Sequence, residues 1–354
     1  MITKILIIIT TLSLLPLSGC GMVELAQLPH EKVENWRTFD PNDYDIEIIR
    51  KDDGSTSYNW TRNTDFNEKD NVLPYWKHSG ALFKNNVIEG QLNGKAYPVI
   101  FDTGCNPMIV ISERLVTESD LPVFFFKPDN KQSSFALVIA DSLKIGSLEL
   151  TDYPCGLWSH KAEFRIFGLP IHKPELILIP LNMMRQFNYF KFDNLNKEVA
   201  FSKASSFAAA DKSEWLSLPF RIEGLYLLLD VSIEGMETTL RLDTGAQYQL
   251  KLDESIVQEL FKKRPDFAKA WKKNTYLYRP YAGGKITGKK FTAKSIHFSN
   301  QKLDRVELIY ADINQDKGYQ GIIGYELFEK TVMVLDFKKN LMWVKKAKGS
   351  RFEQ

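Results

Sequence analysis

The feature that most constrains this chain is an internal repeat marked by two copies of the triplet Asp-Thr-Gly. One copy, Asp102–Gly104, ends the apolar run PVIF, and the other, Asp243–Gly245, ends the run TTLRL. Average residue usage predicts a given triplet of this kind in about one in ten chains of this length, or fewer. Two copies with similar flanks therefore indicate that one structural unit occurs twice in the chain.

The spacing of other features supports the duplication. A glycine lies eight residues before each aspartate, Gly94 in the first copy and Gly235 in the second. The triplets are 141 residues apart, and Asp193 and Asp336, in the later matching stretches FKFDNLNKEVAF and VMVLDFKKNLMWV, are 143 apart. A nearly constant offset between distant motifs predicts two similar halves.

This repeat predicts the division of the chain. We expect a first lobe over residues 79–202 and a second lobe over residues 216–348. The small and polar stretch 203–215 is expected to link them, and residues 20–78 form an N-terminal extension. An aromatic content of 12% suits β-rich lobes with apolar cores.

Two local patterns predict further elements. In the extension, YDIEIIRKDDGSTSYNW alternates like a β-hairpin around Asp53 and Gly54. In the second half, DESIVQELFKKRPDFAKAWKKN predicts a helix that begins near Asp253 and is broken or kinked at Pro265. The stretch SERLVTESDL follows the first triplet at a similar interval and predicts a shorter counterpart.

These motifs resemble the retropepsin-like aspartic peptidases, in a tandem, two-lobed bacterial form. The resemblance covers roughly residues 80–203 and 217–346 and rests on the triplets, on Ile322, Ile323 and Gly324, and on the stretch VMVLDFKKNLMWV. In that family each lobe is a small closed β-barrel whose Asp-Thr-Gly turn is braced by a strand ending in two hydrophobic residues and glycine. The resemblance therefore implies a mainly β fold with two retropepsin-like acid-protease β-barrel lobes.

The first lobe departs from the family pattern. Aligning Asp193 with Asp336 places Leu181 opposite Gly324 in the bracing strand. We therefore expect a leucine beside the first turn, where it would shift Asp102. The second lobe matches better, and its segment YAGGKITGKKF makes Gly283 and Gly284 the candidates for a flap over the cleft.

The resemblance implies chemistry that needs two carboxyl groups. Two carboxyls about 3 Å apart cannot both ionise, so the pair shares one proton. Asp102 and Asp243 are the predicted catalytic pair, with water as the nucleophile. The turns are supported by Thr103, Gly104, Thr244 and Gly245. The predicted function is an aspartic-type endopeptidase acting on an extended peptide or protein. Because both halves lie in one chain, a monomer could be competent.

Two other functions remain open at this stage. Asp, Thr and Gly are common turn residues, so a duplicated barrel can keep them for folding alone. The chain would then be a catalytically inactive lipoprotein whose cleft binds a peptide or an envelope polymer, or a surface scaffold without a peptide cleft. In the binding protein, replacing either aspartate would leave binding largely intact.

The N-terminus predicts the compartment. Residues 1–19 combine Lys4, an apolar run and the ending Leu-Ser-Gly before Cys20, which is typical of a secretory signal peptide. That ending resembles the lipobox at which bacterial lipoproteins are cleaved before an acylated cysteine. We therefore expect a lipid anchor on Cys20 in the bacterial cell envelope. Gly21 follows the cysteine, which favours the outer membrane, with the protein facing the periplasm.

Charge and cysteine content bound the remaining partners. The net charge of +2 with interspersed signs indicates no nucleic-acid partner. Cys105 and Cys155 either form a disulfide that braces the first triplet, or are small buried hydrophobes. Five scattered histidines give no zinc-like spacing, so we expect neither a metal nor a cofactor.

Overall fold

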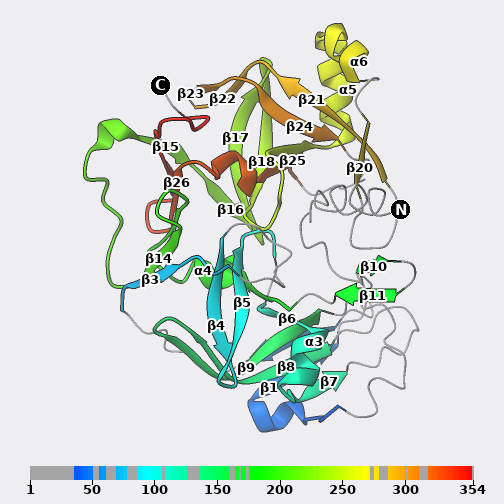
Figure 1. The fold of residues 1–354 in the computed structure, drawn as a ribbon, viewed down its shortest axis with the longest axis vertical. Coiled ribbons are helices and arrows are strands. Elements are labelled where there is room, and N and C mark those ends of the chain that lie inside the picture. Colours follow the sequence, from blue (N-terminus) through cyan, green and yellow to red (C-terminus); the bar gives the residue numbers. More distant parts are fainter. Residues whose placement is uncertain are drawn as a thin grey trace, which may run out of the picture.

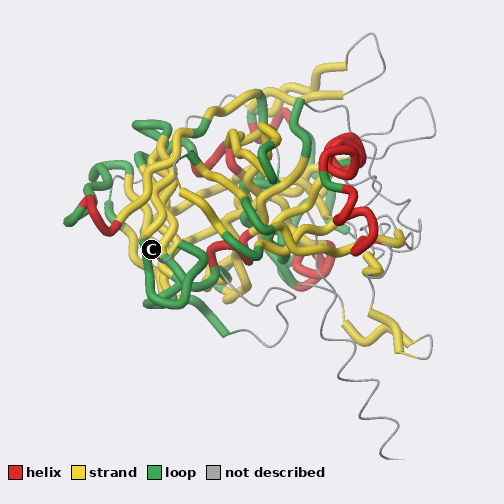
Figure 2. The backbone as a smooth tube through the Cα atoms, turned by 90° about the horizontal axis from the view of Figure 1, so that it is seen from above, coloured by secondary structure: helices red, strands yellow, loops and turns green. Residues whose placement is uncertain are grey.

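The structure is a computed structural model in which strands account for most of the described backbone (Figure 2). It describes residues 36–50, 56–60, 69–77, 86–105, 108–125, 136–158, 164–166, 169–172, 175–271, 275–278, 286–299, 301–310 and 318–352. The predicted signal peptide, Cys20, Gly283 and Gly284 lie outside these ranges. Within them, no helix has both the length and the apolar character needed to cross a membrane.

The first lobe is a closed β-barrel. Its strands pair in the circular order β4-β5-β12-β6-β9-β8, and β8 pairs back to β4, while β7 adds to β8 outside the circle. The bounds are β4 Val87–Leu92, β5 Lys95–Asp102, β6 Val110–Ser112, β7 Val123–Phe125, β8 Ala136–Ile145, β9 Leu148–Trp158 and β12 Ile177–Pro180. Closure removes the exposed edges that an open sheet would leave.

The second lobe repeats these pairings. Its strands run β20-β21-β24-β19-β25-β18-β17-β22-β23, with β16 on β17. The bounds are β16 Arg221–Glu223, β17 Tyr226–Ile233, β18 Met236–Asp243, β19 Leu250–Leu252, β20 Thr275–Tyr278, β21 Ile286–Ala293, β22 Ile296–Phe298, β23 Gln301–Leu303, β24 Val306–Tyr310 and β25 Gly321–Gly324. Here β21 and β22 replace the single strand β8, because the chain bends between them.

The hairpin that leads to each triplet explains the conserved glycine spacing within the repeat. At the β4–β5 turn, Asn93 and Gly94 have φ values of 50° and 77°. At the β17–β18 turn, Glu234 and Gly235 have φ values of 50° and 78°. Two successive positive φ angles define a turn that matches the twist of the paired strands, and glycine adopts them at little cost.

A six-stranded sheet joins the two halves (Figure 1). Its order is β15-β27-β26-β13-β14-β3, so the halves meet where β13 pairs antiparallel with β26. The bounds are β3 Asn71–Pro74, β13 Tyr189–Asp193, β14 Glu198–Ser202, β15 Trp215–Pro219, β26 Val332–Asp336 and β27 Leu341–Lys345. Thus residues 71–74, from the expected extension, are part of this central sheet.

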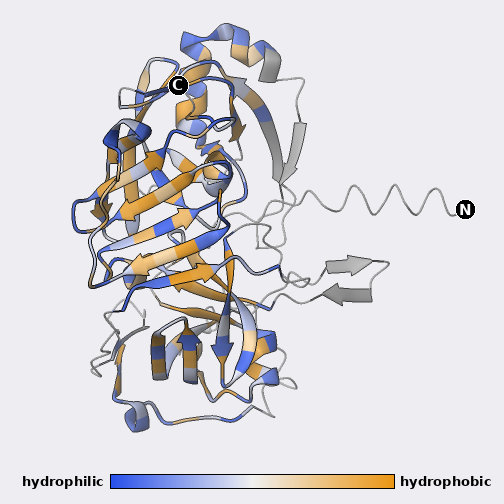
Figure 3. Ribbon diagram, turned by 60° about the vertical axis from the view of Figure 1, so that its left-hand side comes forward, coloured by the Kyte–Doolittle hydropathy of each residue, from blue (hydrophilic) through white to orange (hydrophobic). Residues whose placement is uncertain are grey.

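The core continues from the barrels into the central sheet. One cluster of buried side chains includes Phe101 of β5, Phe190 of β13, Leu242 of β18 and Leu335 of β26. Figure 3 shows the hydrophobic positions gathered along the strands of both lobes. Burial of this shared apolar surface couples the stability of the two halves.

The local predictions are confirmed. The hairpin consists of β1, Ile46–Arg50, and β2, Thr56–Trp60, in antiparallel register. The helix in the second half is interrupted at Pro265, giving α5, Glu254–Lys263, and α6, Pro265–Trp271, and its shorter counterpart is α3, Glu113–Glu118. The remaining elements are β10 Phe164–Ile166, β11 Leu169–His172, α4 Leu181–Met184, η2 Pro41–Tyr44, η3 Lys212–Glu214 and η4 Tyr325–Phe328.

The stretch 203–215, expected as a linker, packs against the central sheet. Phe207 contacts the rings of Tyr189, Trp215 and Trp343. The Lys339 ammonium donates a 2.9 Å hydrogen bond to the Phe207 carbonyl. The stretch therefore covers part of this sheet as well as connecting the halves.

Candidate active site

The two Asp-Thr-Gly triplets lie at equivalent strand ends, one in each lobe. Strand β5 ends at Asp102 and is paired in parallel with β12, and strand β18 ends at Asp243 and is paired in parallel with β25. Each chain then turns sharply, with the amide N–H two residues later donating to the aspartate carboxylate. These bonds are 2.7 Å from Gly104 to Asp102 and 3.0 Å from Gly245 to Asp243.

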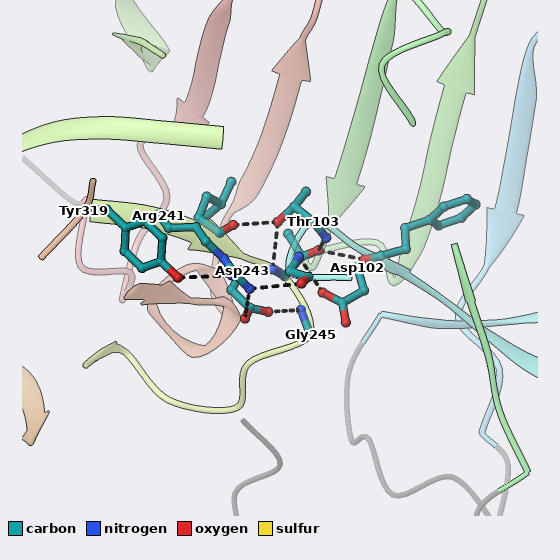
Figure 4. A network of polar contacts seen from close by, with 10 residues as sticks. Asp102, Thr103, Arg241, Asp243, Gly245 and Tyr319 are labelled. Carbon is teal, nitrogen blue, oxygen red and sulfur yellow. Dashed lines mark hydrogen bonds and ion pairs between the residues drawn. The ribbon is translucent and has the colours of Figure 1, made fainter. Parts of the chain in front are cut away.

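Reciprocal hydrogen bonds between the threonines join the turns. The Thr103 hydroxyl donates to the Leu242 carbonyl over 2.9 Å and accepts from the Thr244 amide over 3.0 Å. The Thr244 hydroxyl donates to the Phe101 carbonyl over 2.7 Å and accepts from the Thr103 amide over 3.0 Å. All four residues are buried, so the bonds hold the two turns in one arrangement (Figure 4).

The two glycines allow each turn to approach the aspartate of the other. A Cβ atom added to Gly104 would lie 2.4 Å from the Asp243 carboxyl group, and one added to Gly245 would lie 2.4 Å from an Asp102 carboxyl oxygen. Contacts this short do not occur, so any larger residue at either position would have to displace the facing carboxyl group. The structure therefore brings Asp102 and Asp243 together, each against the opposite turn.

The aspartates are enclosed, with relative exposures of 2% for Asp102 and 0% for Asp243. Burial, followed by the nearby charge of Asp243, raises the pKa of Asp102 to about 7, although the Gly104 amide and the Arg241 charge oppose this rise. A carboxyl that stays protonated near neutral pH can donate a proton, and an ionised partner can accept one. The arrangement is thus capable of general acid–base chemistry.

Arg241 is a third charged residue at this site, and the sequence interpretation missed it. Its guanidinium lies 3.0 Å from the Asp243 carboxylate, in an ion pair whose side chains are 6% and 0% exposed. It also donates to the Gly104 carbonyl over 3.0 Å and to the Tyr319 hydroxyl over 3.3 Å (Figure 4). The sequence did hold a signal for this contact. Alternate residues of a strand share a face, so a charged residue two positions before Asp243 is expected to lie beside it.

Asn86 is a second residue that sequence reasoning missed. It lies just before β4, and its buried side-chain amide donates to the Thr244 carbonyl over 3.0 Å. Arg241 makes the reciprocal contact, from the second lobe to the Gly104 carbonyl of the first. The repeat gave no signal for Asn86. The residue at the equivalent position of the second half, 141 residues later, is Leu227, so the asparagine is not repeated.

The alignment of Leu181 with Gly324 was wrong by one residue. In the structure Asp243 pairs with Gly324, and Asp102 pairs with Pro180. Leu181 instead begins helix α4 and is buried in the core. The offset grows to 144 residues here because the segments between each triplet and its bracing strand differ in length, which spacing alone did not reveal. The other bracing residues, Ile322 and Ile323, lie in β25 as expected.

The alternative of a disulfide between Cys105 and Cys155 does not describe this structure. Both are buried free thiols. The Cys105 sulfur lies 4.0 Å from the Met108 carbonyl, whereas Cys155 belongs to the barrel core and its sulfur lies 3.5 Å from the Tyr153 carbonyl. Each thiol thus has its own packing environment, as expected of small buried hydrophobes.

The remaining predicted features are only partly visible. The segment containing Gly283 and Gly284 joins β20 to β21, which form an antiparallel hairpin, but the glycines themselves lie outside the described residues. The part of the chain that the structure describes contains no group of three or more His, Cys, Asp or Glu side chains placed to hold a metal ion.

Comparison with known proteins gives a likeness to solved structures alone. No protein-family model matches the chain, and no curated protein matches it. A solved structure that does match is a retropepsin-like aspartic protease from Rickettsia conorii, with 14% sequence identity over 37% of this chain and 88% of that one. The TM-score of this match is 0.26.

Proposed function

We propose that this protein is an aspartic endopeptidase that hydrolyses extended peptides with water activated by Asp102 and Asp243. The observation that carries the proposal is the pair of threonine-tied turns, which sets one buried aspartate of each lobe against the other turn. The raised pKa of Asp102 adds to it, because it leaves one carboxyl of the pair protonated near neutral pH.

The proposed reaction needs only these two carboxyl groups and water. The ionised carboxylate takes a proton from water as the water oxygen bonds to the scissile carbonyl carbon. The protonated carboxyl gives its proton to the carbonyl oxygen, and a gem-diol forms. Transfer of the first proton to the amide nitrogen and return of a hydroxyl proton to the other carboxylate then break the C–N bond and restore both groups.

The test is cleavage of a diverse peptide pool from about pH 3 to pH 7, read by mass spectrometry, with a soluble chain that starts after Cys20. Asp102→Asn and Asp243→Asn should each remove the cuts, because a dyad with one carboxyl lacks either the acid or the base. Asp230→Asn, which changes an exposed aspartate on β17, is the matched control and should retain them. Cuts that persist in both dyad variants would exclude this site.

A second candidate function is a peptide-binding protein without catalysis. The buried ion pair between Arg241 and Asp243 favours it, because buried ion pairs of this kind also occur as purely structural features. Such a protein would bind peptides from the same pool without cutting them. Asp102→Asn and Asp243→Asn would then leave binding largely intact.

We further propose that the protein is anchored by lipid at Cys20 in the bacterial cell envelope, at the outer membrane and facing the periplasm. The support is the signal-like sequence of residues 1–19 with Leu-Ser-Gly before the cysteine. Membrane fractionation of the full-length chain tests this. Cys20→Ala should abolish lipid labelling, and labelling that persists would refute the anchor.

A further inference from the structure

The two halves of the dyad do not have the same surroundings, although the fold around them repeats. Asp243 is preceded two residues earlier by Arg241, on the same face of β18. The 141-residue offset places Ile100 at the equivalent position before Asp102, and Ile100 is buried and uncharged. One aspartate therefore has a cation beside it and the other has none at that position.

Arg241 is held in place by more than its ion pair. Its guanidinium lies 5.2 Å from the ring centre of Tyr226 and 5.7 Å from that of Tyr319. These ring faces stabilise a cation that is removed from water. The contact with the Gly104 carbonyl adds a partner from the other lobe, so the side chain has little freedom to leave Asp243.

The charge balance decides which aspartate is ionised. A buried guanidinium needs a nearby negative charge, and the Asp243 carboxylate is 3.0 Å away. Among the residues that the structure describes, the titratable groups facing this pair are Asp102 on β5, Tyr226 on β17, Tyr248 after the second turn and Tyr319 before β25. Tyrosines are neutral at acidic and neutral pH, so the single negative charge of the dyad is the one that Arg241 attracts.

We propose that Arg241 assigns the roles within the dyad, holding the negative charge on Asp243 and leaving the proton on Asp102. This rests on the proposed peptidase function and makes it more specific. Asp243 is then the base that takes the proton from water, and Asp102 is the acid that protonates the peptide carbonyl. Arg241 acts through Asp243 and is a positioning residue.

The first test measures the charge of each aspartate directly and does not depend on activity. Carboxyl carbon NMR of the parent protein labelled in aspartate, assigned with Asp102→Asn and Asp243→Asn, is followed from about pH 3 to pH 8. Near pH 5 we expect the Asp243 signal at the position of a charged carboxylate and the Asp102 signal at that of a protonated acid. The reverse order, or equal sharing of the proton, would overturn the proposal.

The second test separates a charge role from a merely structural one. In Arg241→Met the pH profile of kcat/KM should move to higher pH by about one unit or more, since an opposite charge within about 4–6 Å shifts a carboxyl by this order. Arg241→Lys should restore part of the shift. The control is Arg264→Met. Arg264 is another arginine of lobe two, and it pairs with the Glu234 carboxylate and lies over the ring of Phe267. This variant should leave the profile in place.

The outcomes distinguish this inference from the proposed function. If the parent protein cuts no peptide but shows the expected NMR order, the charge assignment is supported and the peptidase function is refuted. If the parent protein cuts peptides and the pH profile of Arg241→Met is identical to that of the parent, the peptidase function is supported and the role of Arg241 is refuted. If Arg241→Met does not fold, the NMR of the parent and the Arg241→Lys profile still decide.

Discussion

At the scale of single residues, Asp102 differs from an ordinary aspartate because the fold removes it from water and places it beside Asp243. Burial and that neighbouring charge keep it protonated up to about pH 7, whereas the carboxyl of an unfolded chain ionises near 3.8. Between these values the folded state binds more protons than the unfolded state. The contribution of Asp102 to the free energy of unfolding therefore falls as pH rises through this window.

Asp102→Asn should remove the loss of unfolding free energy that the ionisation of Asp102 causes. Relative to the parent, its free energy of unfolding is expected to rise between about pH 4 and pH 7, because asparagine does not ionise. Urea unfolding at a series of pH values measures the difference. Asp193→Asn is a useful control, since hydrogen bonds from Asn196 and Lys191 lower the pKa of Asp193 despite its burial. It titrates below this window, so its difference from the parent should stay constant from about pH 5 upwards.

The threonine bonds give a second prediction at this scale. Thr103→Val would leave the Leu242 carbonyl and the Thr244 amide without that partner, at a cost of about 2 kcal/mol or more in unfolding free energy. Thr244→Val should cost a similar amount, and the double variant less than the sum, because the residues share one network. Chemical denaturation measures all three. Thr151→Val, at an exposed position on β9, should change stability by less than about 0.5 kcal/mol.

At the scale of elements, the bracing strands show how one repeat tolerates different residues. In lobe two, Gly324 lies under the returning chain, and a Cβ atom there would be 2.1 Å from the Tyr248 carbonyl oxygen. In lobe one, Pro180 takes the equivalent place beside Asp102. The proline ring fits at this position. The returning chain of lobe one therefore leaves room for a side chain, whereas the returning chain of lobe two does not.

Gly324→Ala should therefore be more harmful than the matched change Pro180→Ala. We expect a loss of about 2 kcal/mol or more for the first, because backbone rather than a flexible side chain must move. The second removes atoms without creating a clash and is expected to cost about 1 kcal/mol or less. Thermal unfolding of the two variants compares them. Equal losses would mean that the close approach at Gly324 does not control stability.

At the scale of the whole molecule, the halves are joined by more than the threonine bonds. The pairing of β13 with β26 makes one sheet from strands of both halves. A buried polar contact adds to it, in which the Asn194 side chain donates to the Phe328 carbonyl over 2.8 Å and accepts from the Tyr75 hydroxyl over 2.8 Å. These contacts predict that neither half is stable without the other.

Phe190→Ala tests this coupling. Phe190 is fully buried on β13 and stacks against Phe201 of β14, and removing its ring is expected to cost about 3–5 kcal/mol. If the halves unfold as one unit, hydrogen exchange should accelerate in β18 and β25 of lobe two as well as in lobe one. Faster exchange confined to lobe one would show independent lobes. Val72→Ala, on the exposed face of β3, should change neither.

The duplicated unit, its mainly β character and the residues of the two turns could be predicted from the sequence. Those features depend on local patterns, namely the spacing of the triplets, the glycines before them and the alternation of apolar residues. The hairpin around Asp53 and the broken helix at Pro265 were predictable for the same reason, because turn and breaker residues act on their own neighbourhood.

Only the tertiary structure showed that Pro180, rather than Leu181, lies beside Asp102, that Arg241 pairs with Asp243, and that Asn86 reaches the opposite turn. It also placed residues 71–74 in the central sheet. Apart from the Arg241–Asp243 pair, whose members are two positions apart on one strand, these outcomes depend on strand register and on contacts between residues more than seventy positions apart, for which the linear order holds no periodic signal. Packing of the two halves against each other selects them, since a register error of one residue would turn a buried side chain toward the opposite face.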